Sequence, residues 1–211
     1  LHGLVFARQT TKGIVFGLGR AETPCQPADL PANIDDTEGP LRRLVEQIAR
    51  HRRAYPPDAN HPLYRIQPER WMQSLVGGQL SSLGHGLADG PVYEQVPAVS
   101  GTTRGLLDLL TVDAQGRLVV IELKASEDLQ LPLQALDYWM RVHWHHQRGE
   151  IDRGGYFSEC PLSPQPPLLL LVSPALQFHA ASEIILRYLS LEIEVIRVGL
   201  NENWREGLQV V

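Results

Sequence analysis

Two apolar segments joined by a short polar turn constrain the fold of this chain more than any other feature. Residues 106–112 and 117–124 are rich in Leu, Val and Ile, which favour β-strands. Between them lies the sequence Asp-Ala-Gln-Gly, whose glycine can adopt the left-handed backbone conformation that tight turns need. The pattern predicts an antiparallel β-hairpin.

The length of the turn decides which residues face each other. If three residues form the loop, Asp113 pairs with Arg117. Counting back along the ladder then places Asp108 directly opposite Glu122. Lys124 shares that face, because side chains alternate along a strand. A two-residue loop would shift the pairing by one residue and make the contact between the two carboxylates diagonal.

The charges in the second segment need a partner. Both faces of this strand are otherwise apolar, so we expect it to be central and covered on both sides. Charged groups in such a place must be paired or must hold a metal, since burying an isolated ion is costly. A divalent cation would remove the repulsion between Asp108 and Glu122, and oxygen ligands suit Mg²⁺.

These residues resemble a known family. Asp108, followed after a hairpin by Glu122, Leu123 and Lys124, resembles the D…ExK signature of the PD-(D/E)xK phosphodiesterase superfamily. A few residues later, Gln and Tyr at a spacing of four resemble the QxxxY motif of its RecB-like branch. The run Leu-Val-Val-Ile-Glu-Leu-Lys before an amphipathic helix is similar to the catalytic domain of archaeal and actinobacterial mismatch endonucleases. The resemblance covers roughly residues 62–172.

The resemblance implies a restriction-endonuclease-like core and endonucleolytic hydrolysis of DNA phosphodiester bonds with Mg²⁺ or Mn²⁺. By the same resemblance Asp108, Glu122 and the carbonyl of Leu123 would bind the metal. Lys124 would orient the attacking water and stabilise the charge that develops on the phosphate, and Gln134 would position a phosphate or a water.

Two other interpretations of the same residues stay open. The chain could keep the nuclease fold without catalysis and bind nucleic acid or a protein partner. It could also be an ordinary α/β domain in which Lys124 forms a buried ion pair with Glu122 or Asp108.

A third acidic group is implied by the resemblance, and two residues are candidates. Glu69 follows Pro68 and begins a predicted helix, where an acidic side chain is also favoured by the helix dipole. Glu94 lies on the predicted first strand, where it could equally face solvent. We prefer Glu69.

The order of predicted elements is that of the same α/β core, a mixed central sheet flanked by helices. From hydrophobic periodicity and turn residues we predict helix 68–83, strands 91–98, 105–112 and 117–124, helix 129–148, strand 167–172, helix 175–190 and strand 192–199.

The helix after the motif has two predicted stripes at spacings of three and four residues. The apolar stripe, expected to face the core, consists of Leu129, Leu133, Leu136, Met140 and either His143 or Trp144. The polar stripe, expected to face a substrate backbone, consists of Gln134, Tyr138, Arg141 and His145.

Residues 1–60 form a predicted extension of the nuclease-like domain 61–211. The extension has a β-hairpin, a linker rich in Pro and Asp, and a helix over residues 39–55. The helix carries a basic cluster that is a candidate for phosphate contacts, composed of Arg42, Arg43, Arg50, Arg52 and Arg53. Arg104 and Tyr138 are further candidates for contacts with nucleic acid.

The overall charge argues against tight, unaided binding to DNA. The formal net charge is -5, whereas DNA affinity comes largely from neutralising phosphates. We therefore expect DNA as the partner, bound weakly or with help from another domain or protein, and homodimerisation stays open. Neither a signal peptide nor a membrane span is evident in the sequence, and we expect no membrane partner and a cytoplasmic location.

Overall fold

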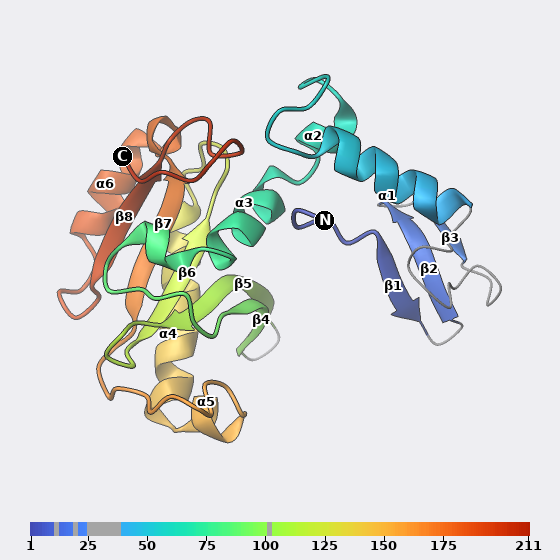
Figure 1. The fold of residues 1–211 in the computed structure, drawn as a ribbon. Coiled ribbons are helices and arrows are strands. Elements are labelled where there is room, and N and C mark those ends of the chain that lie inside the picture. Colours follow the sequence, from blue (N-terminus) through green and yellow to red (C-terminus); the bar gives the residue numbers. More distant parts are fainter. Residues whose placement is uncertain (11–12, 19–20, 25–38, 101–102) are drawn as a thin grey trace. The chain divides into compact units, whose positions relative to one another are not determined.

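The computed structural model describes residues 1–10, 13–18, 21–24, 39–100 and 103–211 (Figure 1). The chain divides into two compact units, Leu1–Trp71 and Met72–Val211, and the division falls inside helix α3. No helix in these described ranges is long and apolar enough to cross a membrane.

The first unit contains a small antiparallel sheet and helices. Strands β1 (Ala7–Thr10), β2 (Gly13–Leu18) and β3 (Ala21–Pro24) pair in this order, so the predicted hairpin is extended by a third strand. Helix α1 (Pro40–His51) begins with proline, whose fixed backbone angle suits the first helical position. The short helix α2 (Pro62–Arg65) follows, and α3 (Pro68–Gly77) begins in this unit.

The second unit is built on a mixed five-stranded sheet with the order β4-β5-β6-β7-β8. Strands β4 (Tyr93–Ser100), β5 (Thr103–Val112) and β6 (Leu118–Leu123) are antiparallel, whereas β7 (Leu168–Pro174) and β8 (Val195–Leu200) continue parallel to β6. Its helical elements are the end of α3, η3 (Leu80–Leu83), α4 (Leu131–Gln147), α5 (Glu150–Arg153), η4 (Ala175–Gln177) and α6 (Ala180–Arg187). The α/β class and the restriction-endonuclease-like order of elements are as predicted.

The central strands are buried on both faces. Every residue of β6 and β7 is buried, as expected for strands whose two neighbours and two faces are covered. Phe178 and Leu186, from the α6 region, pack against the same core cluster as the buried residues of α4. Helices α4 and α6 therefore cover one face of the sheet.

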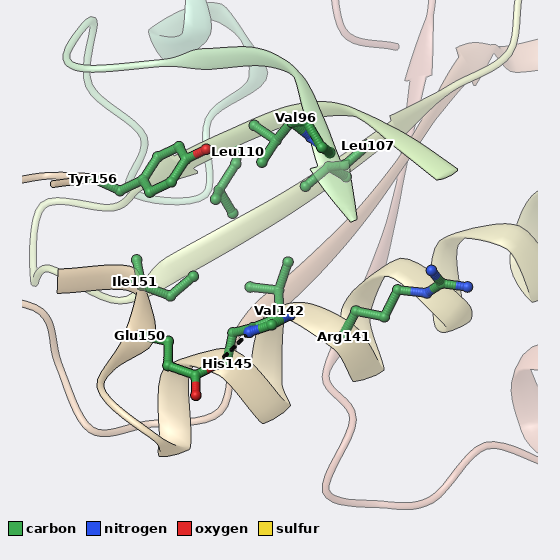
Figure 2. A pocket seen from close by; sticks show the side chains of 10 residues that line it. Val96, Leu107, Leu110, Arg141, Val142, His145, Glu150, Ile151 and Tyr156 are labelled. Carbon is green, nitrogen blue, oxygen red and sulfur yellow. Dashed lines mark hydrogen bonds and ion pairs between the residues drawn. The ribbon is translucent and has the colours of Figure 1, made fainter. Parts of the chain in front are cut away.

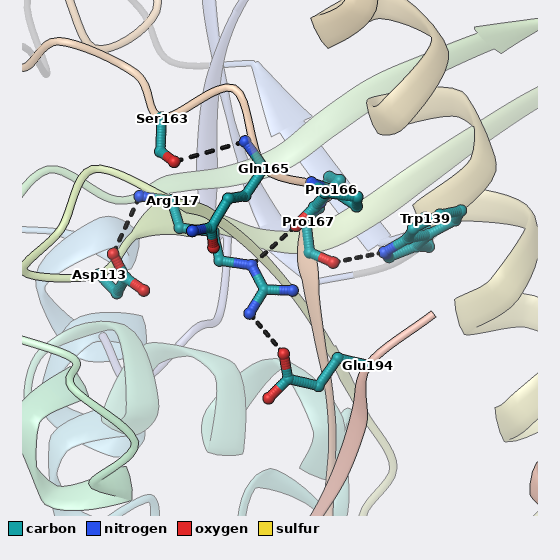
Figure 3. A network of polar contacts seen from close by, with 8 residues as sticks. All are labelled: Asp113, Arg117, Trp139, Ser163, Gln165, Pro166, Pro167 and Glu194. Carbon is teal, nitrogen blue, oxygen red and sulfur yellow. Dashed lines mark hydrogen bonds and ion pairs between the residues drawn. The ribbon is translucent and has the colours of Figure 1, made fainter. Parts of the chain in front are cut away.

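The hairpin between β5 and β6 has the predicted three-residue loop. Asp113 donates its backbone N–H to the carbonyl of Arg117, and its carboxylate accepts the N–H of Arg117. Gly116 has a φ of 76°, the left-handed conformation that this loop requires. Figure 3 shows how the Arg117 guanidinium then ties the turn to the carbonyl of Pro166 and the carboxylate of Glu194.

The predicted apolar stripe of α4 is wrong. Leu129, Leu133, Met140 and Trp144 are all about half exposed, with Trp144 at 52%. The buried face is instead made by a neighbouring stripe, which consists of Leu131, Ala135, Tyr138, Trp139 and Val142. Both stripes have helical spacing and apolar residues, so periodicity alone could not choose between them.

Candidate active site

Asp108 and Glu122 occupy matching positions on β5 and β6. The ladder pairs Val112 with Leu118 and continues to Leu109 and Ile121. Asp108 and Glu122 are the next residues on the two strands, just beyond the last of these pairs. The paired part of the ladder follows the register that the three-residue loop predicts.

The Asp108 carboxylate is held by the backbone of β6. Its Oδ2 accepts the N–H of Leu123 at 3.0 Å, one residue beyond Glu122. Its Oδ1 accepts a hydrogen bond from the side-chain amide of Gln95 at 3.3 Å. Two donors from different strands thus fix the orientation of this carboxylate.

Gln95 is a site residue that sequence reasoning did not identify. It has a φ of 51° in the middle of β4, a conformation that costs free energy for a residue with a side chain. Its amide bridges Asp108 and the Oε1 of Gln73, the latter at 2.9 Å. A glutamine in a predicted strand could have marked Gln95 as a site residue, but its positive φ could not be predicted from the sequence.

The regular alternation of side chains is interrupted on both strands beside this contact. Tyr93 and Val96 pack against the core cluster that includes α4, although they are three residues apart. Leu107 and Leu110 do the same on β5. In a regular strand only residues at even spacing share a face, so the backbone irregularity lies between these residues, where Gln95 and Asp108 are.

Glu122 is almost completely buried, with 1% of its surface exposed. By alternation it lies on the α4 side of the sheet, the side taken by Leu118 and Val120. Lys124 comes two residues later, and its Nζ lies 3.5 Å from the carboxylate of Asp128, at 16% exposure. The predicted pair of Glu122 and Lys124 is thus placed at the carboxyl end of β6.

Gln134 and Tyr138 lie one turn apart on α4 and contact each other. The Gln134 amide donates to the Tyr138 hydroxyl at 3.4 Å. Tyr138 is buried, and its ring packs closely over Gly105 of β5. The ring therefore belongs to the core, and the hydroxyl is the part of Tyr138 directed at Gln134.

The two candidates for a third carboxylate lie in different units. Glu69 is in the first turn of α3, in the first unit, so its role at the site stays a prediction. Glu94 accepts a hydrogen bond from Gln73 at 3.3 Å and lies against Gly77 of α3. Glu94 is therefore one residue from the Gln95 bridge but faces α3, whereas Glu122 is on the α4 side.

The oxygen atoms of the site suit a hard divalent cation. Asp108 and Glu122 supply carboxylates, and Leu123 supplies a backbone carbonyl between Glu122 and Lys124. Mg²⁺ is commonly held by one or two carboxylates while it keeps several waters. Within the described residues, no group of three or more His, Cys, Asp or Glu side chains forms a metal-binding cluster.

A separate cavity lies on the α4 side of the sheet, near its β4 edge. It has a volume of about 150 Å³, and Asp108, Glu122 and Lys124 are not among the described residues that line it. Figure 2 shows Val142 and Ile151 in its wall, together with a hydrogen bond of 2.6 Å between His145 and Glu150. The hydrogen bonds from Arg148 and from His145 lower the pKa of the Glu150 carboxyl.

One of the arginines predicted to contact phosphates is buried instead. Arg52 has no exposed surface, and its guanidinium donates hydrogen bonds to four backbone carbonyls, those of His2, Leu63, Ile66 and Gln67. It also lies 4.7 Å from the centre of the Trp71 ring. The prediction for Arg52 is therefore wrong, because its charge is used inside the first unit.

The other predicted phosphate contacts stay predictions. Arg42, Arg43, Arg50 and Arg53 are exposed, and Arg42 forms an ion pair of 2.9 Å with Glu46 one turn away. The side chain of Arg104 lies outside the described part of the structure.

Comparison with known proteins finds likeness in structure only. No protein family matches the sequence, and no curated protein matches it. The chain is similar to the crystal structure of a repair endonuclease from Pyrococcus abyssi, with 19% identity and a TM-score of 0.41 over 61% of this chain and 45% of that one. It is also similar to EndoMS in a complex with double-stranded DNA, with 17% identity and a TM-score of 0.39 over 61% of this chain and 43% of that one. The chain spans less than half the length of each.

Proposed function

We propose that this chain hydrolyses phosphodiester bonds of DNA with the help of Mg²⁺ or Mn²⁺, as an endonuclease. The observation that supports it most is the placement of Asp108 and Glu122 at matching positions beside Lys124. Glu122 is buried in an apolar strand, where a carboxylate is costly unless it has a use or a partner. The Asp108 carboxylate is preorganised by Leu123 and Gln95.

In this proposal each side chain has a separate task. The carboxylates of Asp108 and Glu122 and the Leu123 carbonyl would hold the metal, which would supply Lewis acidity and activate a water for attack. Lys124 provides a fixed positive charge where negative charge grows on the phosphate. Gln134 holds a phosphate oxygen or a water through its amide, steadied by Tyr138.

A cleavage assay with matched variants tests the proposal. Wild-type protein is incubated with plasmid, single-stranded and branched DNA in the presence of Mn²⁺, beside Asp108→Asn, Lys124→Ala and the exposed control Asp152→Asn. We expect cleavage by wild type and Asp152→Asn, and a loss of at least about a hundredfold in the other two, since each removes charge stabilisation from the reaction. Equal activity of all four proteins would contradict the assignment of the site.

Glu122→Gln separates a metal site from a structural ion pair. At a metal site the substitution removes repulsion between carboxylates, so the temperature of unfolding without metal stays equal or rises while cleavage is lost. A structural ion pair predicts the opposite, because breaking a buried pair leaves an uncompensated charge. Thermal unfolding with and without Mn²⁺ measures both effects, since a ligand that binds the folded state raises its stability.

DNA affinity is expected to be low for the chain alone. The net charge of -5 opposes binding, and the exposed arginines of α1 are the candidate phosphate contacts. Replacing Arg43 or Arg50 with Ala should weaken binding and reduce its dependence on salt by about one phosphate contact each. Tight binding in high salt that neither variant alters would contradict this part of the proposal.

A further inference from the structure

Ser173 is a fully buried polar residue at the carboxyl end of β7. None of its surface is exposed, and its Oγ has no hydrogen-bond partner among the described residues. A buried hydroxyl without a partner costs free energy, and such groups are rare in folded proteins. The hydroxyl therefore calls for an explanation in terms of a water or another bound group.

The register of the parallel strands places Ser173 beside the candidate site. Glu122 pairs with Leu171 and Leu123 with Val172, so Lys124 and Ser173 are the next neighbours. The backbone N–H of Lys124 also donates to the carbonyl of Val172 at 3.0 Å, which continues the ladder to this point.

Ser173 also shares a face of the sheet with the site residues. Leu169 and Leu171 pack in the core cluster on the α4 side, and alternation puts Ser173 on that side. The same alternation on β6 puts Glu122 and Lys124 there. Neighbouring strands are about 4.8 Å apart, so Ser173 and Lys124 are adjacent positions on this face.

The loops that follow β6 and β7 contact each other at this end of the sheet. The backbone N–H of Glu127, after β6, donates to the side-chain oxygen of Gln177 in η4, after β7. The carboxyl ends of parallel strands are where open α/β sheets bind their ligands.

We propose that Ser173 is a positioning residue of the candidate site. Its hydroxyl holds a buried water that accepts a hydrogen bond from the Lys124 ammonium and keeps this charge aimed at the reacting phosphate. The inference rests on the proposed function. It adds a residue that lies 49 positions after Lys124 in the sequence, and no part of the D…ExK pattern points to it.

Three variants test the inference. Ser173→Ala removes the hydroxyl, Ser173→Thr retains it, and Ser182→Ala removes another fully buried hydroxyl, on α6, that also has no partner among the described residues. The measurements are the unfolding temperature, and kcat and KM for metal-dependent cleavage.

We expect Ser173→Ala to unfold at the wild-type temperature or above, since it loses no hydrogen bond to the protein. Its kcat should fall about tenfold with KM unchanged, the effect of one lost hydrogen bond in the transition state. Ser173→Thr should recover most of the kcat, and Ser182→Ala should keep all of it.

Two results would overturn the inference while leaving the proposed function intact. One is wild-type kcat in Ser173→Ala. The other is a loss of kcat that follows a lowered unfolding temperature and appears equally in Ser182→Ala, which would make both hydroxyls structural. Absence of cleavage by the wild-type protein would instead overturn the proposed function, and this inference with it.

Discussion

At the scale of single residues, Arg52 and its neighbour Arg53 show how little the residue type says about its use. Both belong to the basic cluster of the sequence, yet Arg52 is buried against four carbonyls and Arg53 is exposed. The sequence pattern could identify the basic cluster but not that Arg52 is buried. The carbonyls that accept from Arg52 belong to His2 and to residues 63–67, and the pattern does not show that these segments meet it.

Arg52→Met should destabilise the protein strongly. The substitution keeps an apolar stem of similar length but leaves the carbonyls of His2, Leu63, Ile66 and Gln67 without their donor, at a cost of about 3 kcal/mol or more. Arg53→Met is the matched control and should change stability by less than about 0.5 kcal/mol. Urea unfolding measures both, and equal stability of the two variants would contradict the buried role.

Gln95 combines a strained backbone with a contact to Asp108. Gln95→Ala loses the hydrogen bonds and keeps the left-handed backbone, whereas Gln95→Gly loses the same bonds and relieves the strain. The glycine variant should therefore be more stable than the alanine variant by about 1 kcal/mol. Both should lose cleavage activity alike. Denaturant unfolding checks the order, and a more stable alanine variant would refute the strain.

At the scale of elements, the packing of α4 on β5 depends on Gly105. A Cβ at this position would lie 2.5 Å from Cε1 and 2.9 Å from the hydroxyl oxygen of Tyr138. Gly105→Ala should cost about 1–3 kcal/mol, as overpacked core positions do. Gly207→Ala is the control, because nothing lies within 4 Å of the added methyl group.

A double-mutant cycle identifies the contact responsible. If Tyr138 is the obstacle, the combined variant Gly105→Ala with Tyr138→Leu should lose less stability than the sum of the single variants. Additive losses measured by chemical denaturation would show that the cost arises elsewhere.

The elements also show where sequence reasoning succeeds. The β5–β6 hairpin was predictable because a glycine at the end of a short turn favours a three-residue loop, and the loop sets the register. The face of α4 was not predictable, because two apolar stripes compete and only the shape of the sheet selects Leu131, Ala135 and Val142. Ser173 was missed for a related reason. The pairing of β7 beside β6 depends on the crossover through α4, and local sequence pattern does not reveal it.

At the scale of the whole molecule, histidines in both units affect stability in the same direction. Burial lowers the pKa of His2, His51 and His143 from the ordinary value of 6.5. The unfolded chain therefore binds more protons than the folded one as pH falls through about 6.5, so stability is lost over that range and is retained above it.

Thermal unfolding between pH 7.5 and 5.5 should show this loss. His143→Gln should flatten the dependence, because it removes one of the groups that resists protonation in the folded state. His85→Asn, at an exposed position, should leave the slope unchanged. If the unfolding temperature depends on pH equally in His143→Gln and wild type, the loss of stability at low pH comes from other groups.

The exposed face of α4 carries a tryptophan whose fluorescence can be distinguished from that of the others. The chain has four tryptophans, all in the described residues, and Trp71, Trp139 and Trp204 are each at most 5% exposed whereas Trp144 is half exposed. A quencher dissolved in water can collide with Trp144 but not with the other three rings. Fluorescence lost to a quencher therefore comes from the outside of α4, and the emission that survives comes from the interior of the fold.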